Sequence, residues 1–289
     1  MLPWYIADEV ILRALKEDVH YLDASCAYLF DAKHQSKARL LAKAPGVFCG
    51  GEMFLRVFAL LDPACRGESF FKDGAPFERG DVLLELGGPT AVLLQGERTA
   101  LNLLQHLCGI ATATAALVKA VEGTGAFVSE TRKTLPGLRA LQKYAVACGG
   151  GRNHRYNLSD AVMLKDNHID ACGSIAKAVE AVRAKAGHML KIEVETRNLE
   201  EVREALEARA DVIMLDNMTV EQMREAVCMV RASDPDERVL LEASGDITIE
   251  NVREIARTGV DIISVGAVTH SVRAANLSMR IARGWTSKL

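Results

Sequence analysis

The stretch TRKTLPGLRALQKYAVACGGGRNHRYNLSDAVMLKDNH, residues 131–168, carries an excess of cations between ordinary apolar segments. Its basic side chains are Arg132, Lys133, Arg139, Lys143, Arg152, His154, Arg155, Lys165 and His168, against the acids Asp160 and Asp166. A solvated charged face usually mixes both signs, so this excess predicts a polyanionic ligand such as phosphates, a pyrophosphate or a dicarboxylic acid. Arginine suits bidentate recognition of carboxylate and phosphate, and lysine supplies a compact point charge.

The chain around this stretch repeats a strand-like run followed by a helical segment. The six apolar runs are AFVSE (126–130), AVML (161–164), LKIEV (190–194), VIML (212–215), VLLEA (239–243) and IISV (262–265). Capping-box patterns begin the helices at Asn198 and Thr219, and Gly259 ends another helix. Such repetition predicts a parallel sheet covered by helices.

Each of these runs ends in a polar or glycine signature. In chain order the signatures are Thr131-Arg132-Lys133, Lys165-Asp166-Asn167, Glu195, Asp216-Asn217, Ser244-Gly245 and Gly266. In βα barrels the rim at the carboxyl ends of the strands carries the active site. Cations, carboxylates and glycine loops that can turn N–H groups toward a phosphate would therefore meet on one face.

The N-terminal part has a different pattern. Short strand-like segments separated by glycine and proline predict a small α/β domain over residues 1–106, with Asp8 as a helix N-cap. We expect a hairpin turn at Gly87-Gly88-Pro89. Residues 96–123 are strongly helical, with a possible break near Gly109 and Gly123 past the end. The barrel with the active site is expected over 107–270, and a C-terminal helix over 271–289 is expected to pack on the N-terminal domain.

Composition excludes several classes of protein. The 289 residues are 49% hydrophobic with a net charge of -3, which argues against a nucleic-acid binder. No apolar run in the sequence reads as a membrane span or a signal peptide. The seven cysteines contain no CxxC pair and are expected to pack as small buried hydrophobes in a reducing cytosol. A cytoplasmic protein is therefore expected.

Several features have an ordinary structural reading beside the functional one. Gly149-Gly150-Gly151 matches no phosphate-loop pattern and favours a flexible turn. His154 and His168 lack metal-binding spacing, so hydrogen bonding or anion contact is favoured. Cys148 has no evident base partner and is interpreted as packing.

For Glu195, Asp216 and Arg98, the sequence leaves more than one role open. Glu195 and Asp216 could balance the nearby cations, yet they also suit Mg²⁺ or ribose hydroxyls. Arg98 is expected at a helix start, where the dipole disfavours a cation, which points to a ligand or subunit contact.

These motifs resemble those of the quinolinate phosphoribosyltransferase family. They are GERTALN (96–102), TRKTLPGLR (131–139), KYAVACGGGRNHR (143–155), MLKDNH (163–168), KIEVE ending at Glu195, IMLDN (213–217), EASGDIT (242–248) and ISVGAVTHS (263–271). They cover most of the chain from Gly96 on, and the N-terminal part matches more loosely. The resemblance implies an N-terminal α/β sandwich domain plus an open, incomplete α/β barrel. It also implies transfer of the phosphoribosyl group of 5-phosphoribosyl 1-pyrophosphate (PRPP) to quinolinate with decarboxylation, giving nicotinate mononucleotide for de novo NAD biosynthesis.

The resemblance also implies a role for each site residue. Arg132, His154 and Arg155, with Arg98 donated across the interface of a homodimer or higher oligomer, would hold the carboxylates of quinolinate. Lys133 and Lys165 would lie between the two substrates, and Glu195 and Asp216 would engage ribose hydroxyls and Mg²⁺ arriving with PRPP. The backbone of Ser244, Gly245 and Gly266 would bind the 5′-phosphate. Asp246 departs from the family's usual glycine, and we expect its side chain to point away from the phosphate.

Three alternatives stay open from the sequence. A relative of the same fold could use nicotinate or belong to the molybdenum-transport-associated branch. A barrel aldolase or decarboxylase could use Lys133 or Lys165 as a Schiff-base amine. An anion-binding scaffold protein is the third, and it leaves the Glu195 and Asp216 pair unexplained.

Overall fold

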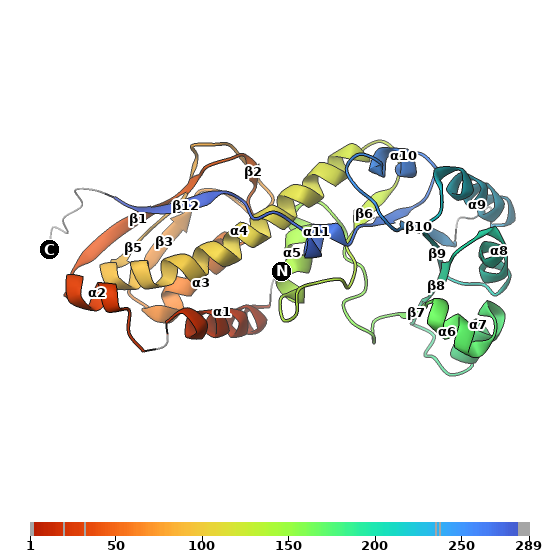
Figure 1. Cartoon of the computed structure of the whole chain (residues 1–289), viewed down its shortest axis with the longest axis horizontal. Coiled ribbons are helices and arrows are strands. Elements are labelled where there is room, and N and C mark those ends of the chain that lie inside the picture. Colours follow the sequence, from red (N-terminus) through yellow and green to blue (C-terminus); the bar gives the residue numbers. More distant parts are fainter. Residues whose placement is uncertain (1–2, 20, 32, 235, 237, 283–289) are drawn as a thin grey trace. The chain divides into compact units, whose positions relative to one another are not determined.

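The computed structural model describes residues 3–19, 21–31, 33–234, 236 and 238–282. The chain divides into two compact units, which are described separately (Figure 1). Unit 1 takes its described residues from Met1–Ala115, Thr134–Gly150 and Ser271–Leu289. Unit 2 comprises Ala116–Lys133 and Gly151–His270.

Unit 1 is built on an antiparallel sheet. Its strand order is β12 (Leu277–Ile281), β1 (Gln35–Ala42), β5 (Val82–Pro89) and β3 (Arg66–Ser69). Alternate residues of β1 are buried, as expected for a strand with one face on a core. The helix α3 (Gly51–Leu61) contributes Met53, Phe54, Val57 and Phe58 to that core. The remaining elements are α1 (Trp4–Asp18), α2 (Ala24–Leu29), the paired strands β2 (Gly46–Val47) and β4 (Pro76–Phe77), and α5 (Arg139–Cys148).

The structure has no hairpin turn at residues 87–89, so that prediction is wrong. Gly87 pairs with Lys37 and Arg66 inside the sheet, and β5 continues to Pro89 before a helix begins at Thr90. A Cβ atom on Gly88 would lie 2.6 Å from the Cys65 sulfur. Glycine is needed here because two chain segments approach closely, and no turn is formed.

The expected break near Gly109 is also absent, because α4 runs unbroken over Thr90–Ala120. A Cβ atom on Gly109 would collide with the carbonyl of Arg273, so this glycine makes room for the segment that leads into β12. By length and composition alone α4 could cross a membrane, but half of its most apolar window is buried within the protein. The core helix of a soluble protein passes the same test.

Unit 2 contains a six-stranded parallel sheet, and all six predicted strands are confirmed. The order is β6 (Phe127–Ser129), β11 (Ile262–Ser264), β10 (Leu240–Ser244), β9 (Val212–Asp216), β8 (Ile192–Thr196) and β7 (Val162–Leu164). The pairs that join them are all parallel. The strands β6 and β7 end this order, so the described sheet is an open barrel.

Helices cover unit 2 in sequence order. They are α6 (Asp166–Cys172), α7 (Ile175–Arg183), α8 (Leu199–Glu207), α9 (Val220–Ser233), α10 (Val252–Ala256) and the short α11 (Ala267–His270). Figure 1 shows α8 and α9 beside β8 and β9, and successive helices from α6 to α10 are in contact. The Asn198 and Thr219 side chains cap α8 and α9 as predicted.

The structure corrects three expectations about the chain's organisation. Residues 277–281 form β12, which pairs with β1, so the expected C-terminal helix is wrong there; residues 283–289 lie outside the described residues. The barrel was expected to be continuous over 107–270, but residues up to Ala115 and residues 134–150 pack in unit 1. Asp8 does not cap α1, which follows Pro3; its carboxylate binds Arg56 at 2.6 and 2.8 Å.

Candidate active site

A cavity of about 520 Å³ lies within unit 2, at the carboxyl ends of the parallel strands. Its lining residues are Thr131, Arg132, Lys133, His154, Arg155, Met163, Lys165, Glu195, Met214, Asp216, Asn217, Glu242, Ser244, Gly245 and Asp246. The cations come from β6, β7 and the loop beside β6, which are the edges of the sheet. The carboxylates come from the carboxyl ends of the inner strands: Glu195 lies near the end of β8, Asp216 ends β9, and Asp246 follows β10. The cavity is therefore cationic on one side and acidic on the other.

The loop that carries His154 and Arg155 is held against β6. The Arg152 N–H donates to the Val128 carbonyl at 2.9 Å, and Arg152 forms an isolated parallel bridge with Ser129. The Arg152 guanidinium lies 4.2 Å from the centre of the Phe127 ring, a cation–π contact. Arg152 therefore positions the loop and does not line the cavity.

His154 forms the most enclosed charged cluster of the site. Its Nε2 lies 3.3 Å from a Glu193 oxygen and 3.5 Å from a Glu242 oxygen, and its backbone N–H donates to Glu130 at 3.1 Å. Glu193 and Glu242 are 5% and 2% exposed. Burial disfavours the charged ring, but hydrogen bonds and charges of both glutamates prevail and raise the pKa of His154 to about 10. The raised pKa favours an imidazolium at neutral pH, in which the proton on Nδ1 would displace the Arg155 N–H that donates to Nδ1 at 2.7 Å.

The sequence analysis did not identify Glu193 or Glu242. Both lie inside strands, β8 and β10, and their neighbours on either side in the sequence are apolar. A glutamate inside an otherwise buried strand was the available signal, because a buried carboxylate needs a partner. Burial raises the pKa of Glu193, while His154 and Arg155 oppose that rise.

Two arginines approach each other on the cationic side. Burial and the neighbouring Arg132 lower the pKa of the Arg155 guanidinium, while Glu193 and Asp160 oppose that effect. One Arg155 nitrogen donates to the Ala161 carbonyl at 2.8 Å, which fixes the side chain. Like charges held together in a half-buried cavity are stabilised by an anion between them, and a dicarboxylate meets that need.

On the acidic side the carboxylates are oriented by neighbouring donors. Lys165 Nζ lies 2.9 Å from a Glu195 oxygen, and Asn217 donates to an Asp216 oxygen at 2.8 Å. Glu195 and Asp216 lie at the carboxyl ends of the adjacent strands β8 and β9, and each has a second carboxylate oxygen. Hard oxygen ligands of this kind fit Mg²⁺ that retains waters and substrate phosphates.

A tight loop follows β10 beside these carboxylates. Gly245 has φ of 101°, and a Cβ atom there would lie 2.1 Å from the Asn217 side-chain oxygen. Asn217 and Asp246 also adopt left-handed φ values of 54° and 44°. The Asn217 N–H donates to the Ser244 carbonyl at 2.9 Å, which joins the two strand ends. Consecutive residues of this conformation can form an anion-binding nest of N–H groups.

Gly266 packs against the side chain of Lys133, one of the residues that line the cavity. A Cβ atom on Gly266 would lie 3.1 Å from Lys133 Cδ, so glycine leaves room for the lysine stem. Thr269 Oγ1 donates to the Lys133 carbonyl at 2.8 Å. Asp246 is exposed at the cavity rim, so the expectation that its side chain points away stays a prediction.

The structure divides the cationic stretch between the two units. Arg132, Lys133, His154, Arg155 and Lys165 meet at the cavity, and so do Glu195, Asp216, Ser244 and Gly245. Arg139 and Lys143 belong to α5 in unit 1, and Arg139 donates to Thr134 at 3.0 Å. His168 accepts the Lys165 N–H at 3.0 Å as part of the α6 cap.

Arg98 does not lie at a helix start, since α4 begins at Thr90. It is exposed in unit 1, whereas every described residue that lines the cavity belongs to unit 2. The explanation of this residue by the helix dipole is therefore wrong, and its expected role at the site stays a prediction.

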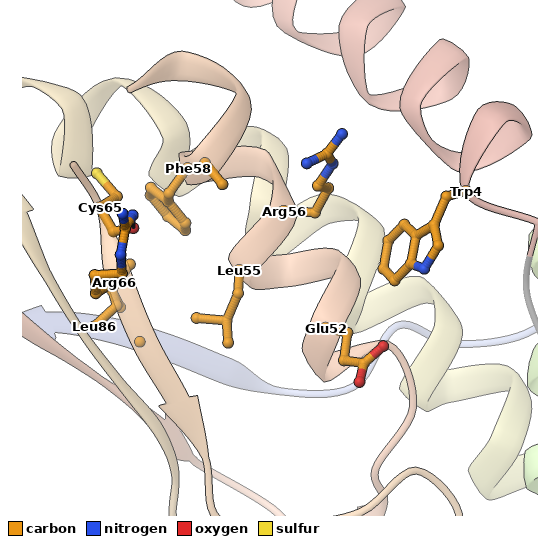
Figure 2. A pocket seen from close by; sticks show the side chains of 10 residues that line it. Trp4, Glu52, Leu55, Arg56, Phe58, Cys65, Arg66 and Leu86 are labelled. Carbon is orange, nitrogen blue, oxygen red and sulfur yellow. Dashed lines mark hydrogen bonds between the residues drawn. The ribbon is translucent and has the colours of Figure 1, made fainter. Parts of the chain in front are cut away.

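A second cavity, of about 650 Å³, lies in unit 1 between α3, β3 and β5 (Figure 2). Figure 2 shows Leu55, Phe58 and Leu86 on its wall and Trp4 at one end. Its Arg56 is paired with Asp8, and its Arg66 donates to backbone carbonyls. This cavity is larger, but its charges do not converge, so the chemistry is placed in unit 2.

A parallel βα barrel whose strand ends gather cations, carboxylates and a glycine loop around one cavity defines an enzyme that binds anionic substrates. Comparison with known proteins narrows this class. Residues 23–108 match the N-terminal domain of quinolinate phosphoribosyl transferase, and residues 110–280 match its C-terminal domain. The chain belongs to the quinolinate phosphoribosyl transferase family.

Individual relatives agree along the whole chain. A probable nicotinate-nucleotide pyrophosphorylase (carboxylating) of Bacillus subtilis is 43% identical, with 92% of this chain and 90% of the relative covered. The human nicotinate-nucleotide pyrophosphorylase (carboxylating) is 39% identical over 92% of this chain and 89% of its own. The crystal structure of NadC from Streptococcus pyogenes superimposes with a TM-score of 0.92 and 43% identity, covering 98% of both chains.

Proposed function

We propose that the protein transfers the phosphoribosyl group of PRPP to quinolinate and releases pyrophosphate and CO₂, with nicotinate mononucleotide as product. The observation that carries this proposal is the grouping of Arg132, His154 and Arg155 at one side of a cavity whose other side is acidic. Quinolinate has two adjacent carboxylates, and three fixed cations offset the cost of desolvating both. Family membership supports the same reaction.

We assign each group of the cavity a role in the transfer. The arginines and the His154 imidazolium hold the quinolinate so that its ring nitrogen faces the ribose carbon. As pyrophosphate leaves, that carbon gains positive charge, which Glu195 and Asp216 stabilise. Lys133 and Lys165 balance the negative charge of both substrates. Because orientation of two anions is most of the task, no covalent enzyme intermediate is required.

Mg²⁺ is proposed as the cofactor, held through Glu195 and Asp216 and through the substrate's phosphates. When bound, it neutralises the charge that develops on the leaving pyrophosphate. The loop at Ser244 and Gly245 is proposed to bind the 5′-phosphate through backbone N–H groups. The left-handed conformation of Gly245 and its contact with Asn217 favour this role.

Loss of CO₂ follows from the charge on the alkylated ring. Once the nitrogen bonds to the ribose it is cationic, so the carbanion left by the departing carboxylate is stabilised next to it. Uptake of a proton at that carbon then gives nicotinate mononucleotide. The second carboxylate of the product would remain with the arginines.

A Schiff-base reaction is disfavoured for Lys165. Its ammonium is paired with Glu195 at 2.9 Å and its side chain is 48% exposed. An amine nucleophile needs a desolvated, uncharged lysine, and an ion pair stabilises the charged form.

The proposal is tested by assaying purified protein with PRPP, Mg²⁺ and either quinolinate or nicotinate. Nicotinate mononucleotide should form from quinolinate and not from nicotinate. Arg132→Ala should raise the KM for quinolinate by about 10- to 100-fold, the range expected for a lost charge-assisted hydrogen bond. Arg257→Ala, an exposed arginine of unit 2, is the matched control. Equal product from nicotinate would contradict the proposal.

The assembly is proposed to be at least a homodimer, with Arg98 completing the site of a neighbouring subunit. The exposure of Arg98 and the buried faces of the residues beside it, Thr99 and Ala100, support an outward-directed role. A third cation beside the two arginines would suit a dicarboxylate.

A further inference from the structure

Two cysteines that are far apart in the sequence meet inside unit 1. Cys49 precedes the first residues of α3, and Cys148 is the last residue of α5. Their sulfur atoms and a carboxylate oxygen of Asp73 all lie within 4.8 Å of one another. The sequence analysis interpreted both cysteines as packing, because nothing in the spacing indicates that they meet.

The surroundings of the pair are built from fixed hydrogen bonds. Asp73 accepts the N–H groups of Gly50 and Gly51 at 2.9 and 3.3 Å and the Tyr144 hydroxyl at 2.7 Å. On the other side, the Cys49 N–H donates to the Cys108 sulfur at 3.3 Å. These hydrogen bonds fix the backbone around Cys49 and the Asp73 carboxylate that lies beside both sulfurs.

One thiol of the pair is accessible and the other is enclosed. Cys49 is completely buried, whereas Cys148 is half-buried. A cavity of about 410 Å³ lies next to the pair, and one of its lining residues is Asp73, whose carboxylate oxygen is within 4.8 Å of both sulfurs. The half-buried Cys148 is the member of the pair that a small polar reagent can reach.

The Cys148 thiol is the more acidic member of the pair. A hydrogen bond from Cys49 lowers the pKa of the Cys148 thiol, although burial and Asp73 oppose this. The same bond, together with burial, raises the pKa of Cys49. Since the thiolate is the nucleophile, Cys148 is the reactive member and Cys49 the proton donor.

A metal site is the competing interpretation of this cluster. A closed structural zinc site takes four ligands, and the cluster supplies three among the described residues. The Asp73 oxygens also already accept three hydrogen bonds. Dithiol chemistry uses the two sulfurs and leaves those hydrogen bonds intact.

We propose that Cys49 and Cys148 form a peroxide-sensitive dithiol that closes to a disulfide. The Cys148 thiolate attacks one oxygen of a hydroperoxide, the O–O bond breaks, and Cys148 becomes a sulfenic acid while the other oxygen leaves as an alcohol or water. The Cys49 sulfur then attacks the Cys148 sulfur and water leaves. Two electrons pass from the dithiol to the hydroperoxide, and a reducing dithiol reverses the change.

A disulfide between Cys49 and Cys148 would affect the segment of chain that follows Cys148. Cys148 is followed by Gly149, and a Cβ atom on Gly149 would lie 2.5 Å from the Ala111 carbonyl, so the end of α5 packs closely on α4. Arg152, His154 and Arg155 come a few residues later. A disulfide that shifts the end of α5 would therefore shift the segment leading to these residues, and oxidation is expected to lower activity several-fold.

The test is mass spectrometry of the full-length protein after treatment with hydrogen peroxide and alkylation of free thiols. We expect a Cys49–Cys148 linked peptide, lost again on reduction. Cys49→Ser should instead leave a sulfenic acid on Cys148 that dimedone traps. Cys228→Ser, which removes an exposed cysteine of unit 2, is the matched control and should still form the link. The readout is a bond within the protein, so it is independent of the reaction catalysed.

Two results would overturn the proposal. In the first, peroxide modifies the exposed Cys172 and Cys228 while Cys49 and Cys148 both remain reduced in the treated protein. In the second, the purified protein holds stoichiometric zinc that both Cys49→Ser and Cys148→Ser remove, which would identify a metal site. Both tests include a measurement on the wild-type protein. A variant that folds poorly therefore does not prevent a conclusion.

Discussion

The site encloses His154, a side chain that can carry a positive charge, between two buried glutamates. His154 lies between Glu193 and Glu242, and the three side chains are largely buried. Removing either glutamate leaves the ring with one carboxylate and the remaining glutamate with less compensation. A buried charge that loses its partner is strongly destabilised. The two glutamates therefore stabilise a positive charge on the His154 ring, although the three groups together carry no net positive charge.

The protonation of His154 should be detectable directly. Its ring should remain charged as the pH rises past its ordinary pKa of 6.5 and lose its proton near pH 10. Because the folded-state pKa is raised, the cluster's contribution to stability is complete below about pH 6.5 and is lost as the pH rises through about 10. NMR titration of the histidine rings checks this. A His154 ring that is neutral at pH 7.5 would contradict it.

Replacing one of the glutamates should weaken binding of the acceptor. In Glu193→Gln the imidazolium loses a charged partner, so the KM for quinolinate should rise by about 10-fold or more while the KM for PRPP changes little. The titration midpoint of His154 should fall in the same variant. Glu180→Gln, an exposed glutamate of α7, is the control and should leave both constants unchanged. A larger change in the PRPP constant would place His154 at the other substrate.

At the scale of residues, the sequence predicts which side chains lie at the strand ends. It does not predict the buried glutamates that contact His154. Arg132, Lys165, Glu195 and Asp216 follow apolar runs, so the parallel-sheet pattern alone places them on one rim. Glu193 and Glu242 lie within runs and interrupt the apolar pattern. Their role depends on a histidine many residues away in the sequence, which only the fold brings near.

At the scale of elements, the loop after β10 depends on one glycine. Gly245→Ala would place a methyl group against Asn217 in a left-handed conformation that costs about 1–2 kcal/mol before any clash. We expect a lower free energy of unfolding and a raised KM for PRPP, measured by urea denaturation and initial rates. Gly187→Ala has open space around it and should change neither. Unchanged PRPP kinetics in Gly245→Ala would separate this loop from the phosphate.

The elements that the sequence predicted poorly are those fixed by distant neighbours. Gly88 and Gly109 were interpreted as a turn and a break, but each makes room for another segment, Cys65 or Arg273. Similarly, residues 277–281 form a strand because the edge of β1 is available for pairing. Local propensity carries no information about such contacts, whereas the apolar runs of unit 2 repeat and could be identified from their period.

At the scale of the whole molecule, the proposed oligomer has a specific signature. If Arg98 acts across subunits, Arg98→Ala and Arg132→Ala should each be nearly inactive alone. A purified mixed dimer of the two should regain about half of the wild-type rate, because one of its two sites has both arginines. The rate of a mixed dimer of Arg98→Ala with Arg257→Ala, whose sites are distributed in the same way, provides the reference. Failure to regain activity in a correctly mixed dimer would show that Arg98 acts within its own chain.

The division of the chain into units also shows the limits of sequence interpretation. The order of six strands was predictable because each βα step is local. The assignment of residues 134–150 to unit 1 was not, because α5 leaves the repeat and packs with segments early in the chain. The cationic stretch consequently serves two units, although it is continuous in sequence.

The most direct measurement follows one labelled carbon through the reaction. Quinolinate labelled in the carboxylate next to the ring nitrogen is incubated with the protein, PRPP and Mg²⁺, and released CO₂ and nicotinate mononucleotide are counted together. We predict equal amounts of labelled CO₂ and unlabelled mononucleotide, with neither formed when PRPP is omitted. Labelled CO₂ without mononucleotide, or mononucleotide that retains the label, would contradict the proposed reaction.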